Sequence, residues 1–255
     1  MTSDPYAARW QPLTLFGQIV VGLFVVSGLG SIAGIIHLVS APPATDITVP
    51  TSELNAELQR ALGTGSASVQ ALSWIVSLAL GVMWLVWQHR AQSDLFARRL
   101  PDIRYTPGWS VGWWFVPGAN LVLPYLCMRE LFGRAGAPVE DPAVRRDWRL
   151  GAWWATYLGS IALGVVGGAS AMAAATSRPQ LDPIDPGQTA WVTVSAEAIR
   201  AARAWVIAGR VSAIVASGLA IWLVWTISRR EDAAFVAMQA SHGLSMPVPP
   251  RPDLS

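Results

Sequence analysis

The pattern of apolar and polar positions along the chain predicts four long hydrophobic helices. A helix needs about 20 consecutive apolar residues to cross a bilayer, and four stretches reach that length. The first is too long for the apolar core of a secretory signal peptide, and only one basic residue, Arg9, precedes it. We therefore interpret it as a retained transmembrane helix, like the other three. The predicted spans are residues 13–39, 69–87, 150–176 and 206–228.

Two of the connecting segments share one plan. Residues 40–68 begin with a proline-rich stretch and continue as TSELNAELQRALG, in which Leu54, Leu58 and Leu62 fall on one face of a short helix. Residues 177–205 have the same order, with SRPQLDPIDPGQ before VSAEAIRAARAW. We predict that both are outer loops, each with a short amphipathic helix.

Between the second and third spans lies an apolar stretch, GWWFVPGANLVLPYLCMREL, that is interrupted by Pro117, Asn120 and Pro124. Each proline removes a backbone donor and disturbs the turn before it. Inside hydrocarbon, broken backbone is tolerated only where protein or water covers it. We therefore predict that residues 109–128 do not cross the bilayer. They either re-enter it from the cytoplasmic side or lie as a kinked helix at the interface, and the sequence leaves both open.

The arginines beside the spans support a central segment that does not cross. If residues 109–128 crossed the bilayer, the arginines that flank the spans would divide almost evenly between its two sides. If these residues do not cross, most of the flanking arginines lie on one side. Arginine excess in short loops marks the cytoplasmic side. We therefore predict that the arginine-rich region 89–149 and both termini are cytoplasmic. The tail ends in SMPVPPRPDLS, a proline-rich composition typical of disorder.

An internal repeat indicates the same topology. The tetrapeptide WLVW ends the second span at residues 84–87 and the fourth span at residues 222–225. The first and third spans each carry small residues in GxxxG-like spacing, which favours close packing of helices within one chain or between two chains. Two copies of one hairpin should have parallel orientation, as a non-crossing centre requires. The predicted packing glycines are Gly30 and Gly34 in the first span and Gly164 and Gly168 in the third.

Composition supports a membrane protein. The chain is 53% hydrophobic and 13% charged, with 14 tryptophans, whereas a soluble domain has about 25% charged residues. The net charge of +2 is too small to indicate nucleic acid as a partner. The single cysteine, Cys127, excludes an intramolecular disulfide and a cysteine-based metal site.

No motif in the sequence indicates catalysis, a cofactor or a metal. The histidines His37, His89 and His242 do not have metal-ligand spacing. Ser27 and Ser217 each precede a glycine and could suggest intramembrane nucleophiles, but small residues at helix contacts explain them better. The spans contain no acidic residue, which argues against a proton relay or a cation-coupled carrier. We therefore expect no enzymatic activity.

Arg210 is the exception among the charges, because it lies about one turn inside the fourth predicted span. An ionisable residue inside a membrane is a candidate functional residue. Its position also lets a long side chain reach the outer interface, which would need no function. The inner loops rich in arginine are explained by topology, and attraction to anionic lipid headgroups at the cytoplasmic face would be a further consequence.

The run from WLVWQHRAQSDLFARRLP through TPGWSVGWWFVPGANLVLPYLCMRELFGRAG to DWRLGAWWATYLG resembles a bacterial membrane family, domain of unknown function 4328. That family has a tryptophan-rich helix end, an arginine, the pattern G-W-x-x-x-W-F-x-P-x-x-N-L-x-x-P-Y and a Trp-Trp pair. Ser93-Asp94 departs from it, because relatives more often have Asn there. The resemblance implies a multi-pass helical membrane protein and transfers no functional residue. The matching positions are Trp87, Arg90, Gly108, Trp109, Trp114, Pro117, Asn120, Pro124, Tyr125, Trp153 and Trp154.

The predicted fold is all-α: an integral membrane protein with four transmembrane helices in two parallel-repeated hairpins around a central re-entrant or interfacial segment. Its regions are a cytoplasmic N-terminus (1–12), a first hairpin (13–88), a cytoplasmic region (89–149), a second hairpin (150–228) and a cytoplasmic tail (229–255). The candidate re-entrant or cavity residues are Pro117, Asn120, Pro124, Tyr125 and Arg210.

The function that these features predict is a non-enzymatic accessory or scaffold protein of the bacterial cytoplasmic membrane. The alternative is a small transporter or channel-like module that uses the re-entrant segment around Asn120. The expected partners are the lipid bilayer and a membrane protein or a second copy of the chain, without nucleic acid and without a cofactor.

Overall fold

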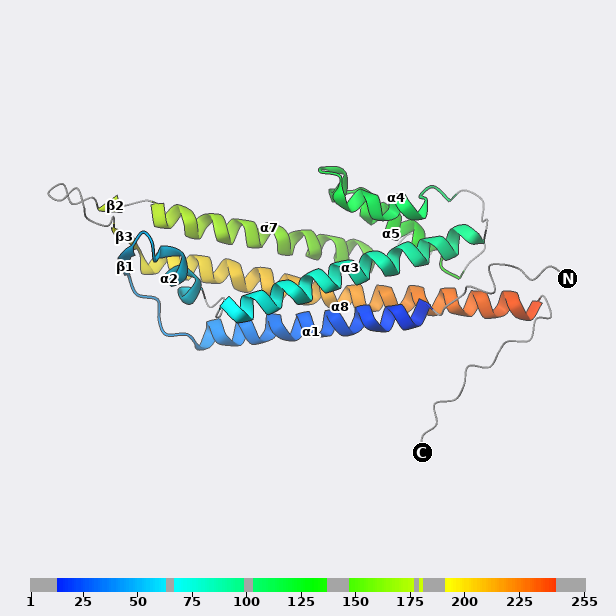
Figure 1. The fold of residues 1–255 in the computed structure, drawn as a ribbon, viewed down its shortest axis with the longest axis horizontal. Coiled ribbons are helices and arrows are strands. Elements are labelled where there is room, and N and C mark those ends of the chain that lie inside the picture. The colour runs from blue at the N-terminus through cyan, green and yellow to red at the C-terminus, as the bar shows by residue number, and fades with distance from the viewer. Residues whose placement is uncertain are drawn as a thin grey trace, which may run out of the picture. The chain divides into compact units, whose positions relative to one another are not determined.

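A computed structural model describes residues 13–62, 67–98, 103–136, 147–176, 179–180 and 191–241, and these are mostly helical (Figure 1). The predicted N-terminus 1–12 and the tail beyond Ser241, which includes His242, lie outside the described residues. The helices are α1 (Leu13–Ser40), α2 (Leu54–Ala61), α3 (Ala67–Ala97), α4 (Pro107–Gly112), the 3-10 helices η2 (Trp113–Phe115) and η3 (Ala119–Leu121), α5 (Leu123–Arg134), α7 (Trp148–Thr176) and α8 (Ala196–Ser241). The strands are β1 (Ile47–Pro50), β2 (Pro179–Gln180) and β3 (Trp191–Val194).

Among the described residues, four helices are long and apolar enough to cross a membrane, and these helices, α1, α3, α7 and α8, contain the four predicted spans. Many of their large apolar side chains are exposed in the folded chain. Exposure of so much apolar surface to water is unfavourable, whereas exposure of the same surface to the lipid of a bilayer is not. The four helices therefore indicate a membrane protein. The candidate spans are Leu13–Ser40, Ser68–Ala97, Trp148–Ser170 and Ala196–Ala237, and exposed side chains on them include Leu29, Ile36, Leu72, Ile75, Leu78 and Val165.

The chain divides into two compact units. Unit 1 comprises Met1–Val20, Met83–Asp147 and Trp222–Ser255, and unit 2 comprises Val21–Val82 and Trp148–Ile221. Helices α1, α3 and α8 contribute residues to both units.

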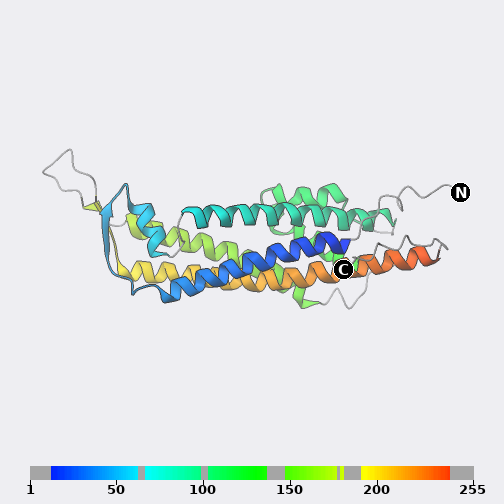
Figure 2. The ribbon, with the colours of Figure 1, turned by 60° about the horizontal axis from the view of Figure 1, so that its bottom comes forward.

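Unit 2 contains a small antiparallel sheet in the order β1-β3-β2 (Figure 2). Ile47 pairs with Val194, and the hydroxyls of Thr48 and Thr193 lie 3.0 Å apart across the strands. The described residues are mostly helical, as predicted, and the sheet is an addition that the sequence analysis did not predict. The first predicted outer loop contributes β1 and the second contributes β2 and β3. The sheet packs on α2, and the apolar face predicted for that helix is confirmed at its first two leucines. The core consists of Leu54, Leu58, Val192, Val194 and Ile199.

Hydrogen bonds also connect the two predicted outer loops of unit 2. A carboxylate oxygen of Asp46 accepts a hydrogen bond of 2.7 Å from the backbone N–H of Ala196, and Ser195 Oγ accepts one of 3.3 Å from Ala198. Both contacts satisfy donors at the N-terminus of α8. Arg203 donates to the carbonyl oxygens of Ala61 (2.8 Å) and Pro42 (2.9 Å). The two segments therefore form one folded cap.

Helix α8 is longer than the sequence analysis predicted. The amphipathic stretch from Ala196 is continuous with the fourth span, so it is not a separate short helix. At the other end, α8 runs on to Ser241, so the first part of the predicted tail is helical. The two predicted hairpins therefore differ, because α2 and α3 are separate helices whereas their counterparts in the second hairpin form one helix.

In unit 1, the central segment forms a broken helical hairpin of residues 107–134, which we call the central hairpin. Helices α4 and α5 contact each other, and η2 and η3 join them. The chain reverses at Gly118, whose φ of +80° is easily adopted only by glycine. Pro124 lies in the first turn of α5, where a missing N–H leaves no hydrogen bond unmade. The prolines therefore mark a turn and a helix start.

Candidate functional site

The two ends of the central hairpin are tied together by Glu130. Its carboxylate oxygens accept hydrogen bonds from the backbone N–H groups of Arg104 (2.9 Å) and Tyr105 (3.2 Å). Gln92, on α3, donates to the carbonyl oxygen of Tyr105 (2.8 Å) and to Glu130 (3.3 Å). The chain therefore enters and leaves the hairpin at the same place, beside α3.

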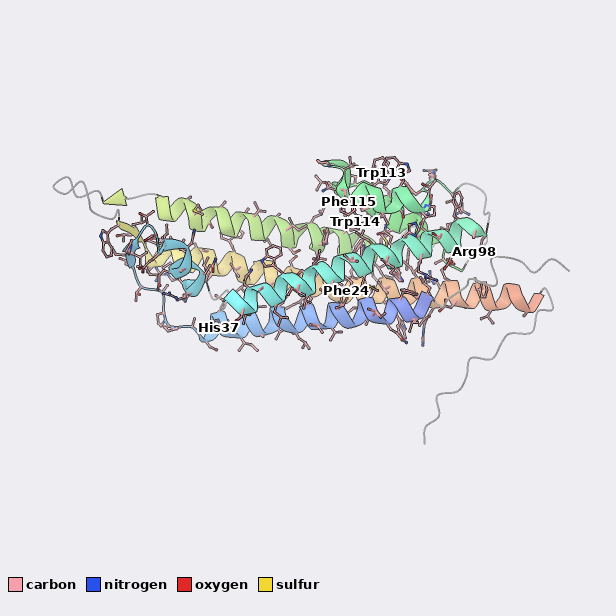
Figure 3. All side chains as sticks on the ribbon, in the orientation of Figure 1. Phe24, His37, Arg98, Trp113, Trp114 and Phe115 are labelled. Atoms are coloured by element: carbon pink, nitrogen blue, oxygen red, sulfur yellow. The ribbon has the colours of Figure 1, made fainter. Side chains whose placement is uncertain are left out.

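A second glutamine of α3 holds α4. Gln88 is 1% exposed, and its amide nitrogen donates to the carbonyl oxygen of Ser110 at 3.1 Å. Its amide oxygen accepts a 2.9 Å hydrogen bond from the indole nitrogen of Trp114, which Figure 3 labels beside Trp113 and Phe115. Sequence reasoning missed these glutamines. Their spacing of one helical turn directly after WLVW places both on one face of α3, and that was the available signal.

The tip of the central hairpin is apolar and exposed. Phe115 is 70% exposed, and Leu121 and Val122 are also exposed. Backbone hydrogen bonds close the turn, including one of 3.0 Å from Asn120 to the carbonyl oxygen of Val116. Among the described residues, the Asn120 side chain makes no hydrogen bond. Pro117 is exposed at the tip, and Pro124 is buried.

Helix α8 supplies a buried ion pair to unit 1. Arg98, at the end of α3 (Figure 3), forms a 2.7 Å ion pair with Glu231 and donates to the carbonyl oxygen of Arg134 at 3.1 Å. Glu231 is buried and also accepts a 3.3 Å hydrogen bond from the backbone of Gly136. The next residue, Asp232, accepts from the first two backbone donors of α1 and from the Thr14 hydroxyl. Carboxylates of α8 therefore fix the end of the central hairpin and the start of α1.

Tryptophan residues pack where these elements meet. Trp87 is fully buried and donates a 3.0 Å hydrogen bond to the hydroxyl of Ser228. Trp84 lies edge-on to Trp114, with ring centroids 6.4 Å apart. In the second WLVW copy, Trp225 is 38% exposed under the guanidinium of Arg229. The two copies therefore have different environments, and the internal repeat stays a prediction.

Cys127 is buried within the central hairpin, on α5. Burial raises the pKa of its thiol to about 12, and the nearby negative charge of Glu130 adds to that shift. Because the thiolate is the reactive form of cysteine, we expect this buried thiol to react slowly near neutral pH. It has the properties of a packing residue.

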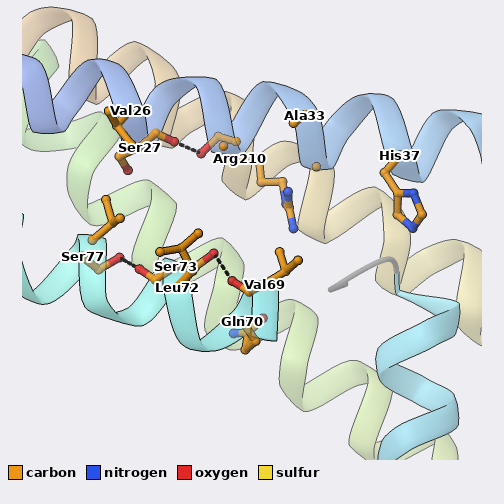
Figure 4. A pocket seen from close by; sticks show the side chains of 14 residues that line it. Val26, Ser27, Ala33, His37, Val69, Gln70, Leu72, Ser73, Ser77 and Arg210 are labelled. Atoms are coloured by element: carbon orange, nitrogen blue, oxygen red, sulfur yellow. Dashed lines mark hydrogen bonds between the residues drawn. The ribbon is translucent and has the colours of Figure 1, made fainter. Parts of the chain in front are cut away.

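Unit 2 contains a cavity of about 660 Å³ between α1, α3 and α8. Figure 4 shows the guanidinium of Arg210 reaching from α8 into the space between α1 and α3, where Ser27 on α1 and Ser73 and Ser77 on α3 lie along the same cavity. Asn120 does not line this cavity. The lining residues are Val26, Ser27, Gly30, Ser31, Ala33, Gly34, His37, Val69, Gln70, Leu72, Ser73, Val76, Ser77 and Arg210.

The predicted packing glycines occupy different environments. A Cβ at Gly34 would overlap the guanidinium of Arg210, whereas one at Gly30 or Gly168 would meet nothing within 4 Å. The backbone of Gly164 lies close to α8. A Cβ added at Gly209 on that helix would lie 3.7 Å from the backbone nitrogen of Gly164. Their role in packing stays a prediction.

Other candidates for chemistry are isolated. The Ser217 hydroxyl donates a 2.8 Å hydrogen bond to the carbonyl oxygen of Ala213, one turn earlier in its own helix. Ser27 and His37 both line the cavity from α1, but their ten-residue separation places them about 15 Å apart along the helix. In the described part of the chain, no group of three His, Cys, Asp or Glu side chains could hold a metal ion.

Comparison with known proteins places most of the chain in one family. The model of the family described as Domain of unknown function (DUF4328) matches residues 51–229. No curated protein and no solved structure matches the chain.

Proposed function

The chain belongs to the family described as Domain of unknown function (DUF4328), and we propose that it is a non-enzymatic accessory or scaffold protein of the bacterial cytoplasmic membrane. The observation that carries this proposal is the central hairpin. Buried polar side chains hold it firmly, yet its tip presents exposed apolar residues. A rigid element that presents an unpaired apolar surface suits binding to a lipid or protein surface.

The buried polar groups of unit 1 support a structural role for this hairpin. Gln88 and Gln92 use their amide groups to hold backbone and side-chain partners of the hairpin. Glu130 and Glu231 accept from backbone N–H groups at its two ends. Groups committed to such contacts are poorly suited to proton transfer or nucleophilic attack, because a catalytic group must face its substrate.

We propose that the tip around Phe115, Leu121 and Val122 enters the cytoplasmic leaflet from the inner side. Its exposed side chains are apolar, and transfer of each from water to lipid is favourable by about 1.5–3 kcal/mol for full burial. The backbone of the tip is closed by its own hydrogen bonds, which hydrocarbon requires. A shallow position of the tip at the membrane interface would also bring these apolar side chains into contact with lipid.

The transport alternative receives less support from the geometry. A pathway through the re-entrant segment needs a polar cavity that reaches Asn120, whereas the cavity of unit 2 is lined by α1, α3 and α8. The two functions predict different effects of Asn120→Leu. Transport through the segment would be abolished, but a scaffold would show no more than a small loss of stability, since this side chain makes no hydrogen bond in the described chain.

Crosslinking in native membranes tests the scaffold role. A photoreactive amino acid placed at Phe115, on the exposed tip, should crosslink to a membrane protein or to a second copy of the chain. The matched control is the same amino acid at Phe132, which is buried in unit 1. If the tip position crosslinks only to lipid, and the chain is monomeric in mild detergent, the scaffold proposal is wrong.

A further inference from the structure

Among the residues that the structure describes, Arg210 is a charged side chain without a protein partner, in a predominantly apolar part of unit 2. Among the described residues, its guanidinium makes no ion pair or hydrogen bond, and the predicted spans contain no acidic residue. A charge in the membrane region is normally paired or directed to a water-filled space. Here it points into a cavity of about 660 Å³ (Figure 4). The cavity therefore has room for an anion beside the guanidinium.

The fold makes space for this arrangement at Gly34. The guanidinium lies where any side chain at position 34 would begin. Gly30, one turn earlier on α1, lines the same cavity, but a Cβ there would meet nothing within 4 Å. Gly34 therefore positions the charge, whereas Gly30 does not.

The other polar side chains of the cavity offer acceptors. Ser31, Ser73 and Ser77 donate their hydroxyl hydrogens to the carbonyl oxygens one turn earlier, at 2.8–3.1 Å. Each hydroxyl oxygen then keeps lone pairs that can accept a hydrogen bond. A matching ligand would combine an oxyanion, for the guanidinium, with hydroxyl donors for the serines.

The surroundings favour an amphiphile over a free anion. Val26, Leu72 and Val76 line the cavity beside the polar groups. Next to it, α1 and α3 expose large apolar side chains such as Leu29, Ile36 and Ile75, along which alkyl chains can pack. Gly34 also lies about 9 Å before the end of α1 by helical rise, which is a suitable depth for a headgroup.

We propose that this cavity binds the headgroup of an anionic, hydroxyl-bearing phospholipid, with Arg210 holding the phosphate. The serine oxygens accept from the headgroup hydroxyls, and the acyl chains follow the exposed faces of α1 and α3. Phosphatidylglycerol has this chemistry. The site is separate from the cytoplasmic arginine loops, where attraction to anionic lipid needs only net positive charge.

Native mass spectrometry of the full chain from detergent tests this site. The probes are phosphatidylglycerol, phosphatidylcholine with the same acyl chains, and inorganic phosphate. We expect one retained phosphatidylglycerol per chain and no retention of the other two. Arg210→Gln and Gly34→Ala should each weaken binding of phosphatidylglycerol about tenfold or more, as expected for loss of a charge-assisted hydrogen bond. Gly28→Ala adds the same methyl group to the same helix, outside the cavity lining and where a Cβ would meet nothing within 4 Å, so this control should bind like the unchanged chain.

The proposal is overturned if Gly34→Ala binds phosphatidylglycerol as well as Gly28→Ala does. It is equally overturned if phosphatidylcholine is retained to the same extent, since choline lacks the hydroxyl donors and cancels the charge. If inorganic phosphate binds and phosphatidylglycerol does not, the ligand is a free oxyanion, and the proposal of a lipid ligand is wrong. Thermal unfolding of each variant shows whether a loss of binding reflects a loss of folding. The comparison of Gly34→Ala with Gly28→Ala keeps the Arg210 side chain in both proteins.

Discussion

At the scale of single residues, the buried polar side chains of unit 1 give the sharpest expectations. Gln88→Leu would remove the hydrogen bonds that the carbonyl oxygen of Ser110 and the indole N–H of Trp114 make with this glutamine. An unsatisfied buried polar group costs about 1–3 kcal/mol, so we expect the unfolding temperature in detergent to fall clearly. Gln70→Leu is the control, because Gln70 is exposed on the same helix. Equal unfolding temperatures of the two variants would show that the Gln88 contacts contribute nothing.

Cys127 gives a prediction about reactivity. Since burial raises the pKa of its thiol to about 12, the thiolate fraction stays very small from pH 7 to pH 9 and increases only as the pH approaches that pKa. A maleimide should therefore leave the folded chain unlabelled in mild detergent at pH 8 and label it after denaturation in SDS. Rapid labelling of the folded protein at pH 8 would show that the thiol is accessible and ionised, contrary to this structure.

At the scale of elements, the turn of the central hairpin depends on Gly118. Its φ of +80° would strain any residue with a Cβ, so Gly118→Ala should destabilise the hairpin by about 1–2 kcal/mol. Gly108→Ala is the control, because its Cβ would meet nothing within 4 Å inside α4. Chemical unfolding followed by tryptophan fluorescence measures both variants. A Gly118→Ala protein as stable as Gly108→Ala would contradict the reversal at this residue.

The elements also show what the sequence could predict. The four apolar helices follow from length and composition alone, and the prolines correctly marked where the central segment breaks. The sheet was missed because its strands are short and lie among prolines, although the alternation in ITVP and WVTV is a strand signal. The length of α8 was underestimated because amphipathic and apolar stretches were treated as separate helices, while no proline or glycine separates them between Ala196 and Val206.

The partners of the candidate residues could not be predicted from spacing. Arg210 was identified as an unusual charge, but its relation to Gly34 joins α8 to α1, far apart in the sequence. Likewise, Gln88 and Gln92 became informative only when the hairpin was seen to fold back onto α3. Helical periodicity assigns a residue to a face of its helix, and it does not say which helix lies opposite.

At the scale of the whole molecule, the proposed topology depends on both ends of the central hairpin facing the cytoplasm. Single cysteines at Ala97 and Trp148, one on each side of the hairpin, should be protected from a membrane-impermeant thiol reagent in intact cells. A cysteine at Ser52, in the predicted outer loop, should be labelled. All three positions are exposed on the protein, whereas a cysteine at Gly136 would be strained by its φ of +73° and would approach the carbonyl oxygen of Arg230 to 2.8 Å.

These three positions distinguish the two topologies without a change in the hairpin itself. Helix α3 spans about 45 Å from its 31 residues, which is longer than the roughly 30 Å hydrocarbon core of a bilayer, so its own two ends can lie on opposite sides. A segment that crossed would bring the Trp148 position to the outer side while Ala97 stayed inside. Because Glu130 holds the exit of the hairpin beside its entrance at Arg104 and Tyr105, we expect the two inner positions to respond alike. Each should become reactive only after the cells are permeabilised, and labelling of Trp148→Cys in intact cells would require the hairpin to open.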